Sequence, residues 1–468
     1  MRLSALEQVP LFDGFTPHQA LEDMVSLARG LEELDFHRFW IAEHHNTPVF
    51  MSSAPELVMA HLLDRTSRIR IGSGGVMAMH QGSLQMAEKF FTLATLFPGR
   101  VDMGLGRAPG GDMISARALN QGTTIDPQSI NALIDETLAF MRGTLPEGHP
   151  YASVGVYPRP DELPEVWLLG SSGQSAAWAG TRNMNYAYAQ FFSGQQQPEV
   201  MDHYRAHLPD NPETRGDGAH HRGGSAGHDS IHGGQTLSAL CVSAAATREE
   251  AREQALVAAD ARFSLRTGRP MRFRDPATLD AAYRAEVERY LERDTAIIVG
   301  TYDEVAQALS SFAENHGTEE VMLISYIDDV EVRTRQYAEL AARLLGRRHV
   351  GLAAVLEETL GLRLAKDHAA ADWSTRPLPT SWLTYAALDV ELLIDLRDAL
   401  AAELEAAGKD QWAAQEFEHV RTKPARPAKV DPWRKTPRAG SSVRSPRSLA
   451  ILRELWNSRE QLAAELDR

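Results

Sequence analysis

Cysteine and long apolar runs are nearly absent from this sequence. Cys241 is the only cysteine among 468 residues, so the chain can form no internal disulfide and no thiolate metal cluster. It lies in the apolar run TLSALCVS, where a small core residue is expected. No apolar run approaches the ~18 residues that span a membrane, and the amino terminus lacks a basic stretch followed by an apolar core. We therefore expect a cytoplasmic protein with no membrane contact.

Basic residues are also scarce, but unevenly so. Lysine and arginine number 48 against 63 aspartates and glutamates, and the net charge of −15 argues against nucleic acid as the partner of the chain as a whole. Only between residues 421 and 459 do basic residues far outnumber acidic ones. At ~150 residues per domain the length suggests two or three domains. The charge asymmetry indicates a carboxyl-terminal part of different origin.

The stretch Ile69–Gly111 predicts a strand, an amphipathic helix, a turn at Pro98-Gly99 and a second strand. A strand, a crossover helix and another strand imply a parallel sheet. Both strands end in clusters of glycine, at the edge where α/β proteins place their ligands. Similar units recur close to eight times over the first ~345 residues. This count predicts an α/β fold, a (β/α)8 TIM barrel with insertions.

Three ionisable residues follow an apolar strand in the sequence HRFWIAEHHNTP. Glu43, His44 and His45 would cost desolvation energy there unless they are paired or used. A histidine can pass a proton near neutral pH. Neighbouring residues of a strand point to opposite sides, so at most one of the two histidines is expected to face a ligand, and joint metal binding is disfavoured.

A serine-rich turn follows a later strand, in PEVWLLGSSGQSAAWAG. Ser171, Ser172 and Ser175 lie at the start of a predicted helix, where backbone NH groups and hydroxyls suit a phosphate. Ordinary helix caps use the same residues, so the motif alone is weak. The segment 209–235 is almost free of apolar residues and is predicted to be a mobile loop. Its histidines, His220, His221, His228 and His232, lack preorganised geometry, and we predict no metal site.

These motifs together resemble the bacterial-luciferase-like flavin monooxygenases. The matching pieces are WIAEHH, TSRIRIGSGGVM, MAEKF, LFPGRVDMGLGRAPGGD, VWLLGSSGQSA and VMLISY. The resemblance as a whole extends over about residues 1–345. The resemblance implies a barrel that binds FMN at the carboxyl ends of its strands. It also implies reduced FMN from a separate flavin reductase, molecular oxygen and a small organic substrate, with a deazaflavin as the alternative cofactor. A homodimer is one expected assembly.

The resemblance also implies roles for single residues. His44 matches the family's active-site histidine, and Gly74-Gly75 lies where the family often has a non-proline cis peptide against the flavin. Arg107, Ser172 and Ser175 match residues that contact the flavin phosphate. Glu88 matches a recurring acid of uncertain role. The segment AMHQGSL departs from its relatives, so Met79 and His80, with His45, are weaker candidates for the substrate pocket.

The carboxyl-terminal part has a different residue pattern. Residues 346–420 predict short helices, and the segments DWSTRPLP and YAALDVELL resemble ribonuclease D, a 3′-5′ exonuclease. Residues 431–468 resemble the start of that enzyme's helical nucleic-acid-binding domain. Tyr385 and Asp389 match its last motif, in which the aspartate binds metal. Two magnesium ions need about four carboxylates, and the strands that would carry the others are missing.

We therefore expect an all-α, incomplete ribonuclease D-like tail without nuclease activity. Two alternatives stay open at this point. One is a bifunctional oxidoreductase and exoribonuclease, and the other is a basic tail that binds RNA weakly without cleaving it.

Overall fold

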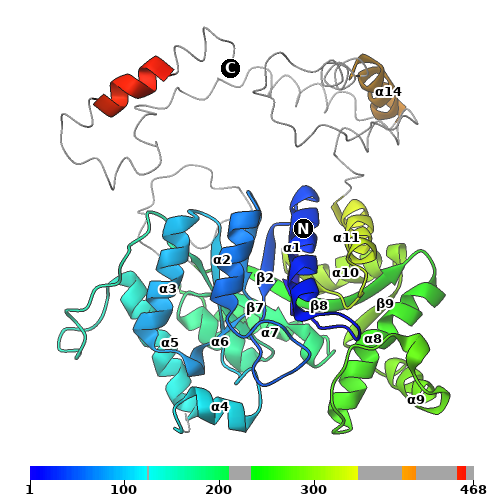
Figure 1. The fold of residues 1–468 in the computed structure, drawn as a ribbon, viewed down its shortest axis with the longest axis horizontal. Helices are drawn as coiled ribbons and strands as arrows, with labels where there is room; N and C mark the ends of the chain where they lie inside the picture. Colours follow the sequence, from blue (N-terminus) through cyan, green and yellow to red (C-terminus); the bar gives the residue numbers. More distant parts are fainter. Residues whose placement is uncertain (124–125, 210–232, 346–392, 407–450, 460–468) are drawn as a thin grey trace. The chain divides into compact units, whose positions relative to one another are not determined.

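The structure is a computed structural model that describes residues 1–123, 126–209, 233–345, 393–406 and 451–459. The chain divides into two compact units, Met1–His349 and Val350–Arg468. Figure 1 shows the first unit as a ring of helices around a sheet. Within the described residues, no helix is long and apolar enough to cross a membrane.

A closed parallel barrel of eight strands forms the centre of the first unit. Its last strand pairs with the first strand and also with the seventh, which closes the ring. In ring order the strands are β1 (Arg2–Glu7), β2 (Arg38–Ile41), β3 (Arg70–Ser73), β5 (Val101–Gly106), β6 (Glu165–Gly170), β7 (Asn185–Ala189), β8 (Thr236–Ala245) and β10 (Glu320–Ile324). The predicted TIM barrel is confirmed.

The helices cover the outside of this barrel (Figure 1). They are α1 (Pro17–Glu33), α2 (Pro55–Arg65), α3 (Ser83–Leu96), α4 (Met113–Leu119), α5 (Pro127–Arg142), α6 (Gly173–Thr181), α7 (Glu199–Ala206), α8 (Arg248–Arg266), α9 (Ala281–Leu291), α10 (Tyr302–His316) and α11 (Val330–Leu345). Local sequence sets several of their ends. A capping box of Thr16 and Gln19, with Pro17 in the first turn, starts α1, and Gly317 in a left-handed conformation ends α10.

Two short strands lie outside the ring. β4 (Val76–Met77) pairs with the end of β5, and β9 (Ile297–Thr301) pairs with the second half of β8. The sequence suggested β9 as one of the alternating barrel strands. Because β8 is ten residues long, its first half pairs with β10 and its second half is free to pair with β9. The strand after α10 therefore closes the ring, and β9 extends the sheet at one end.

Alternate residues of each strand point into the barrel. Ser4 and Leu6 do so from β1, and Arg38 and Trp40 from β2. Trp40 meets Trp167 of β6 across the interior, with ring centroids 5.5 Å apart. A Cβ on Gly72 would lie 2.5 Å from Trp40 Nε1, which explains the glycine in β3. Cys241 is buried in this interior, as expected.

The helix α11 belongs to the barrel. It packs against α1 and α10, and Arg333 of α11 pairs with the buried Glu7 at 3.0 Å. Gln336 accepts a hydrogen bond from the backbone NH of Ala244 at 2.7 Å and donates one to Ser325 Oγ at 2.9 Å. These buried contacts hold α11 against β8 and against the residues that follow β10.

In the second unit the described residues form α14 (Leu393–Ala406) and a further helix over residues 451–459. The candidate nuclease residues Tyr385 and Asp389 lie outside the described residues. So do the four histidines of the segment 209–235 and nearly all of that segment.

Candidate functional site

A cavity of about 250 Å³ opens at the carboxyl ends of the barrel strands. Apolar side chains supply most of its wall, and its polar side chains are few. Its wall includes six of the candidate site residues, which are His44, Gly74, Gly75, Arg107, Ser171 and Ser172. The other lining residues are Leu6, Gln8, Trp40, Ala42, Glu43, Met77, Gly106, Ala108, Leu169, Gly170, Ala187, Ala189, Phe191, Phe192, Leu237, Ala239 and Met322. Residues from distant parts of the sequence therefore meet in one place, as a parallel barrel requires.

His44 lies in the loop after β2, which ends at Ile41 rather than continuing through the histidines. Its backbone NH donates to Ser52 O at 2.8 Å, and its ring stacks on Phe50 with centroids 4.2 Å apart. Nδ1 is buried and has no hydrogen-bond partner in the described part of the chain. Burial, with a smaller contribution from His45, lowers the pKa of His44 to about 4. The imidazole is therefore neutral at pH 7 and can accept a proton.

The neighbouring His45 does not line the cavity. Its Nε2 lies 2.7 Å from Glu43 Oε1, and its ring meets that of His80 edge to face. The other carboxylate oxygen of Glu43 accepts the backbone NH of Met77 at 2.8 Å. Glu43 is thus used twice within the protein, and it ties the loop after β2 to β4. The two histidines have different surroundings, but strand alternation is not the reason, because both lie in the loop after β2.

The peptide bond Gly74-Gly75 is cis, and both residues line the cavity. A Cβ on Gly75 would lie 2.8 Å from Gly104 O, so the backbone after β3 passes close to that of β5. With no side chain at either position, the wall at this point consists of bare peptide. A flat ring system can approach such a wall closely.

Arg107 follows β5 and is half-buried at the mouth of the cavity. None of the ion pairs in the described part of the chain includes its guanidinium, which lies 5.9 Å from the centre of the Trp178 ring. Burial lowers the pKa of Arg107 below its ordinary value, although the group stays charged at neutral pH. A partly desolvated cation without a carboxylate partner is poised to bind an anion.

Ser172 is the N-cap residue of α6, and its side chain forms a capping box with Ser175. Ser175 is fully buried: its hydroxyl donates to Ser172 O at 2.7 Å and lies 2.9 Å from the Tyr186 hydroxyl. Ser171 and Ser172 line the cavity, whereas Ser175 lies behind Ser172. The structure therefore brings two of the three candidate serines to the same cavity as Arg107.

Met79 and His80 lie outside this cavity. His80 Nε2 is 2.8 Å from Pro109 O, and its Nδ1 is 3.1 Å from Asn120 Nδ2. Met79 lines a separate groove beside α4, a helix that the sequence did not predict. Glu88, on α3, is also absent from the cavity wall. The structure does not bring these candidates together with His44.

Several cavity residues were missed by sequence reasoning. Gln8, Phe191 and Phe192 line the cavity but belong to none of the motifs. For Gln8 a signal existed, because Ser4, Leu6 and Gln8 alternate along the first strand and share its inward face. Phe191 and Phe192 follow β7 and carry no comparable pattern. Phe192 is 66% exposed and forms part of the mouth.

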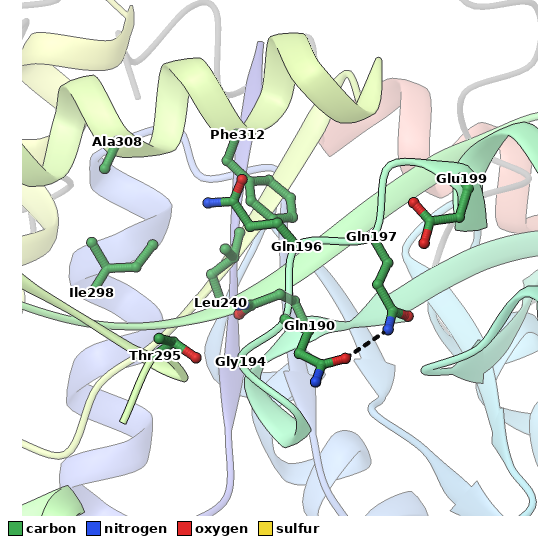
Figure 2. A pocket seen from close by; sticks show the side chains of 11 residues that line it. Gln190, Gly194, Gln196, Gln197, Glu199, Leu240, Thr295, Ile298, Ala308 and Phe312 are labelled. Carbon is green, nitrogen blue, oxygen red and sulfur yellow. Dashed lines mark hydrogen bonds between the residues drawn. The ribbon is translucent and has the colours of Figure 1, made fainter. Parts of the chain in front are cut away.

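A second cavity, of about 700 Å³, lies among β8, β9, α10 and the loop after β7. Figure 2 shows its glutamine-bearing loop facing α10. Within this loop Gln197 donates to Gln195 Oε1 at 2.9 Å. Gln190 is 2% exposed, and its Oε1 has no hydrogen-bond partner in the described part of the chain. None of the candidate site residues lines this cavity.

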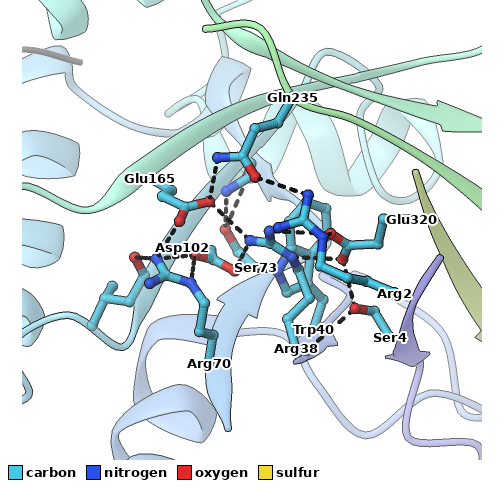
Figure 3. Close-up of polar contacts among 12 residues, drawn as sticks. Arg2, Ser4, Arg38, Trp40, Arg70, Ser73, Asp102, Glu165, Gln235 and Glu320 are labelled. Carbon is cyan, nitrogen blue, oxygen red and sulfur yellow. Dashed lines mark hydrogen bonds and ion pairs between the residues drawn. The ribbon is translucent and has the colours of Figure 1, made fainter. Parts of the chain in front are cut away.

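The amino-terminal end of the barrel is filled by charged side chains instead (Figure 3). Arg38 is 0% exposed and bonds to Asp102 at 2.8 Å, to Glu165 at 3.0 Å and to Glu320 at 2.7 Å. Arg70 donates to the other oxygen of Asp102. Burial alone would raise the pKa of Asp102, but Arg70 and Arg38 outweigh it and hold that pKa below its ordinary value. Every charge in this network is paired.

Known proteins share the sequence and the fold of this barrel. Residues 5–319 match the model of the luciferase-like monooxygenases, about two thirds of the chain. The chain belongs to the luciferase-like monooxygenase family. A Bacillus subtilis relative, N-acetyl-S-alkylcysteine monooxygenase, is 31% identical over 349 residues, which is 74% of this chain and 98% of the relative. The crystal structure of apo-MsnO8 is 28% identical and has a TM-score of 0.62, with 74% of this chain and 98% of that one covered.

The carboxyl-terminal part of this luciferase-like chain has a different relationship. Residues 324–405 match a 3′-5′ exonuclease family. The ribonuclease D of Nitrobacter hamburgensis is 37% identical over 126 residues, which is 27% of this chain and only 32% of that enzyme. The exonuclease match begins at the end of β10 and includes α11, which the structure places in the barrel. A helix that matches the exonuclease family in sequence therefore packs as part of the barrel.

The residues at the cavity fit a flavin mononucleotide. The wall of bare peptide at Gly74-Gly75 suits a flat ring, and the guanidinium of Arg107 lacks a carboxylate partner, as described above. The amino terminus of α6 adds unpaired backbone donors beside Ser172. Among the described residues, no group of histidines, cysteines and carboxylates is arranged to hold a metal ion.

Proposed function

We propose that the barrel is an FMN-dependent monooxygenase that uses reduced FMN from a separate flavin reductase and molecular oxygen. The observation that carries this proposal is the convergence of Arg107, Ser172 and the Gly74-Gly75 wall on one apolar cavity. Reduced FMN, when bound, supplies the electrons that activate oxygen. The chain itself must bind the phosphate, orient the ring, exclude water and move a proton.

The phosphate would bind to Arg107, to the Ser172 hydroxyl and to the first NH groups of α6. The charge-assisted bond from Arg107 is worth roughly 1.5–3 kcal/mol. Ser175, which is buried behind Ser172, would act by holding Ser172 and the first turn of α6 in place. The ring would lie against Gly74-Gly75, which Glu43 supports through its bond to Met77.

His44 is the proton-transfer group in this proposal. Its Nδ1 is enclosed, so Nε2 is the nitrogen that can reach the cavity. Because burial keeps the imidazole neutral at pH 7, His44 accepts a proton and returns it within one turnover. The apolar wall keeps bulk water from competing for that proton.

The relative from Bacillus subtilis suggests a thioether as the first substrate to try, because its name specifies N-acetyl-S-alkylcysteine. The purified chain would be supplied with N-acetyl-S-butylcysteine, a flavin reductase, FMN and ¹⁸O₂. We expect a sulfur-oxidised product that carries one labelled oxygen atom. His44→Asn should retain FMN binding and slow product formation by about 10²-fold, as loss of a general base commonly does.

Two outcomes would contradict this assignment. A chain that oxidises a reduced deazaflavin without incorporating labelled oxygen is a hydride-transfer enzyme. A chain that binds neither FMN nor a deazaflavin is not a flavin-dependent oxidoreductase. Unchanged turnover in His44→Asn would leave the flavin assignment standing but would make His44 a structural residue.

For the tail we propose no nuclease activity, because the chain spans about a third of the ribonuclease D that it matches. The full chain should not shorten single-stranded RNA in the presence of magnesium. Degradation that Asp389→Asn abolishes would show a bifunctional enzyme. Salt-sensitive RNA binding without cleavage would show an RNA-binding tail.

A further inference from the structure

One polar side chain in the cavity wall has no role in the proposed chemistry. Gln8 is 8% exposed, and its Oε1 accepts a hydrogen bond from the Tyr326 hydroxyl. Burial raises the pKa of Tyr326 well above its ordinary value, so this hydroxyl remains a donor. In this arrangement the carbonyl end of the Gln8 amide faces Tyr326. The NH₂ group is left without a protein acceptor among the described residues.

Gln8 reaches the same cavity as His44 from the neighbouring strand. β1 and β2 pair in parallel through Leu6 and Trp40, and Gln8 and His44 lie just beyond their ends. Both side chains line the cavity. An amide donor and a proton-accepting imidazole are therefore held on adjacent strand ends.

A run of aromatic rings connects the supports of these two groups. Tyr326 stacks on Phe273 at 5.1 Å, Phe273 meets Phe50 at 5.5 Å, and Phe50 stacks on His44 at 4.2 Å between centroids. Phe273 comes from the segment between α8 and α9, far away in the sequence. Packed rings of this kind resist displacement. Gln8 and His44 thus share one rigid support at the top of the barrel.

The remainder of the cavity defines what Gln8 can bind. Arg107 is the only basic side chain with a full charge in the described wall, and the proposed function assigns it to the phosphate. Both oxygens of Glu43 are already bonded. Apolar side chains supply most of the remaining wall. Ser171 and Ser172 lie with Arg107 in the part of the wall that the proposed function assigns to the phosphate, so a substrate would meet a mostly apolar surface on which Gln8 offers a neutral hydrogen-bond donor.

We propose that Gln8 is a substrate-binding residue that donates its side-chain NH₂ to a neutral carbonyl oxygen of the substrate. The substrate class is then an apolar chain that carries an amide or similar carbonyl near the atom to be oxidised. This inference rests on the proposed function, because it takes the FMN phosphate to occupy Arg107. Tyr326 is a positioning residue that orients the Gln8 amide.

The test compares two probes that differ only in the acetamido group, N-acetyl-S-butylcysteine and 3-(butylthio)propanoate. Their affinities for the FMN-loaded full chain are measured from the change in flavin absorbance. Gln8→Met keeps the length of the side chain and removes the donor. It should weaken N-acetyl-S-butylcysteine about fivefold, as loss of one neutral hydrogen bond does, and leave 3-(butylthio)propanoate within about twofold.

Two further variants separate a donor from a merely structural residue. Tyr326→Phe frees the Gln8 amide without removing it, so it should cause a smaller loss, again only for the acetamido probe. Gln195→Met, in the second cavity, should change neither affinity. In turnover, Gln8→Met should raise KM for the acetamido probe and leave kcat nearly unchanged.

The outcomes distinguish this inference from the proposed function. A wild-type chain that does not bind FMN would overturn the proposed function. Normal FMN binding, with equal losses for both probes or no loss for either in Gln8→Met, would overturn the role of Gln8 alone. So would a wild-type chain that binds the two probes equally.

Discussion

Two arginines at opposite ends of the barrel, Arg38 and Arg107, have opposite charge surroundings. At the amino-terminal end Arg38 is enclosed by Asp102, Glu165 and Glu320, and each charge has a partner. At the carboxyl-terminal end Arg107 is half-buried beside a cavity, and no ion pair in the described part of the chain includes it. The charges around Arg38 are complete without a ligand, whereas Arg107 is left with a charge that an anion can pair. Charge pairing thus distinguishes a structural arginine from a candidate binding arginine.

The largest predicted effect comes from making the same substitution at both ends. Arg38→Met removes the central cation of the network, leaving Asp102 with Arg70 and Glu320 with only Arg2 as cationic partners, and should cost about 3–5 kcal/mol of unfolding free energy in urea. Arg107→Met removes a cation without a carboxylate partner, and should change stability by less than about 1 kcal/mol. Arg252→Ala, in an exposed ion pair with Glu292, is a control expected within roughly 0.5 kcal/mol. A similar cost at Arg38 and Arg107 would refute the comparison.

Acidification should destabilise both ends of the barrel by protonating a partly buried histidine at each end. Burial, then the charge of Arg38, lowers the pKa of His37 to about 4, and burial lowers that of His44 to about 4. In the folded protein both pKa values lie below the ordinary value of histidine. Each neutral histidine therefore contributes to the unfolding free energy above pH ~6.5, and this contribution is lost as the pH falls toward 4. Each histidine should contribute on the order of 1–3 kcal/mol.

The measurement is the unfolding free energy between pH 7 and pH 4.5. The variants His37→Asn and His44→Asn should each show a shallower decline than the wild type. A decline of the same steepness in both variants would mean that carboxylates alone cause the acid sensitivity.

The smallest effect is expected from the tail. Both ends of the barrel are built from residues before 346, including Glu320 of β10 and Arg333 of α11. A chain that ends at His349 should therefore keep its FMN affinity and lie within about 1 kcal/mol of the full chain in stability. A chain that ends at Glu319, where the family match stops, lacks the strand that closes the barrel, and should not fold. Equal behaviour of the two truncations would contradict the assignment of α11.

The sequence predicted the parts of this site that belong to local motifs. His44, Gly74-Gly75, Arg107 and Ser172 each follow a strand, and parallel strands bring their ends together regardless of separation in the sequence. Gln8 and its aromatic support were not predicted, because Phe273 and Phe50 meet only through packing between distant loops. Local pattern carries no information about such contacts.

The same limit explains why the weaker candidates do not line the cavity. Met79 and His80 are close in sequence to the glycines of the wall, but the turn after β4 directs them toward α4 and the loop after β5. Ser175 matches a family motif, yet the capping geometry of α6 directs its hydroxyl inward. The sequence predicted a boundary near residue 345, and the packing of α11 against α1 and α10 places this helix in the barrel.

The central claim is that Arg107 binds the phosphate of FMN, and comparing FMN with riboflavin tests it most directly. Dissociation constants for both are measured with the wild-type chain and with Arg107→Met by flavin fluorescence. We expect the wild type to bind FMN more tightly than riboflavin, and Arg107→Met to lose more than tenfold for FMN while riboflavin stays within about twofold, because roughly 1.5–3 kcal/mol depends on the phosphate. Equal losses for both ligands, or none for FMN, would contradict the account.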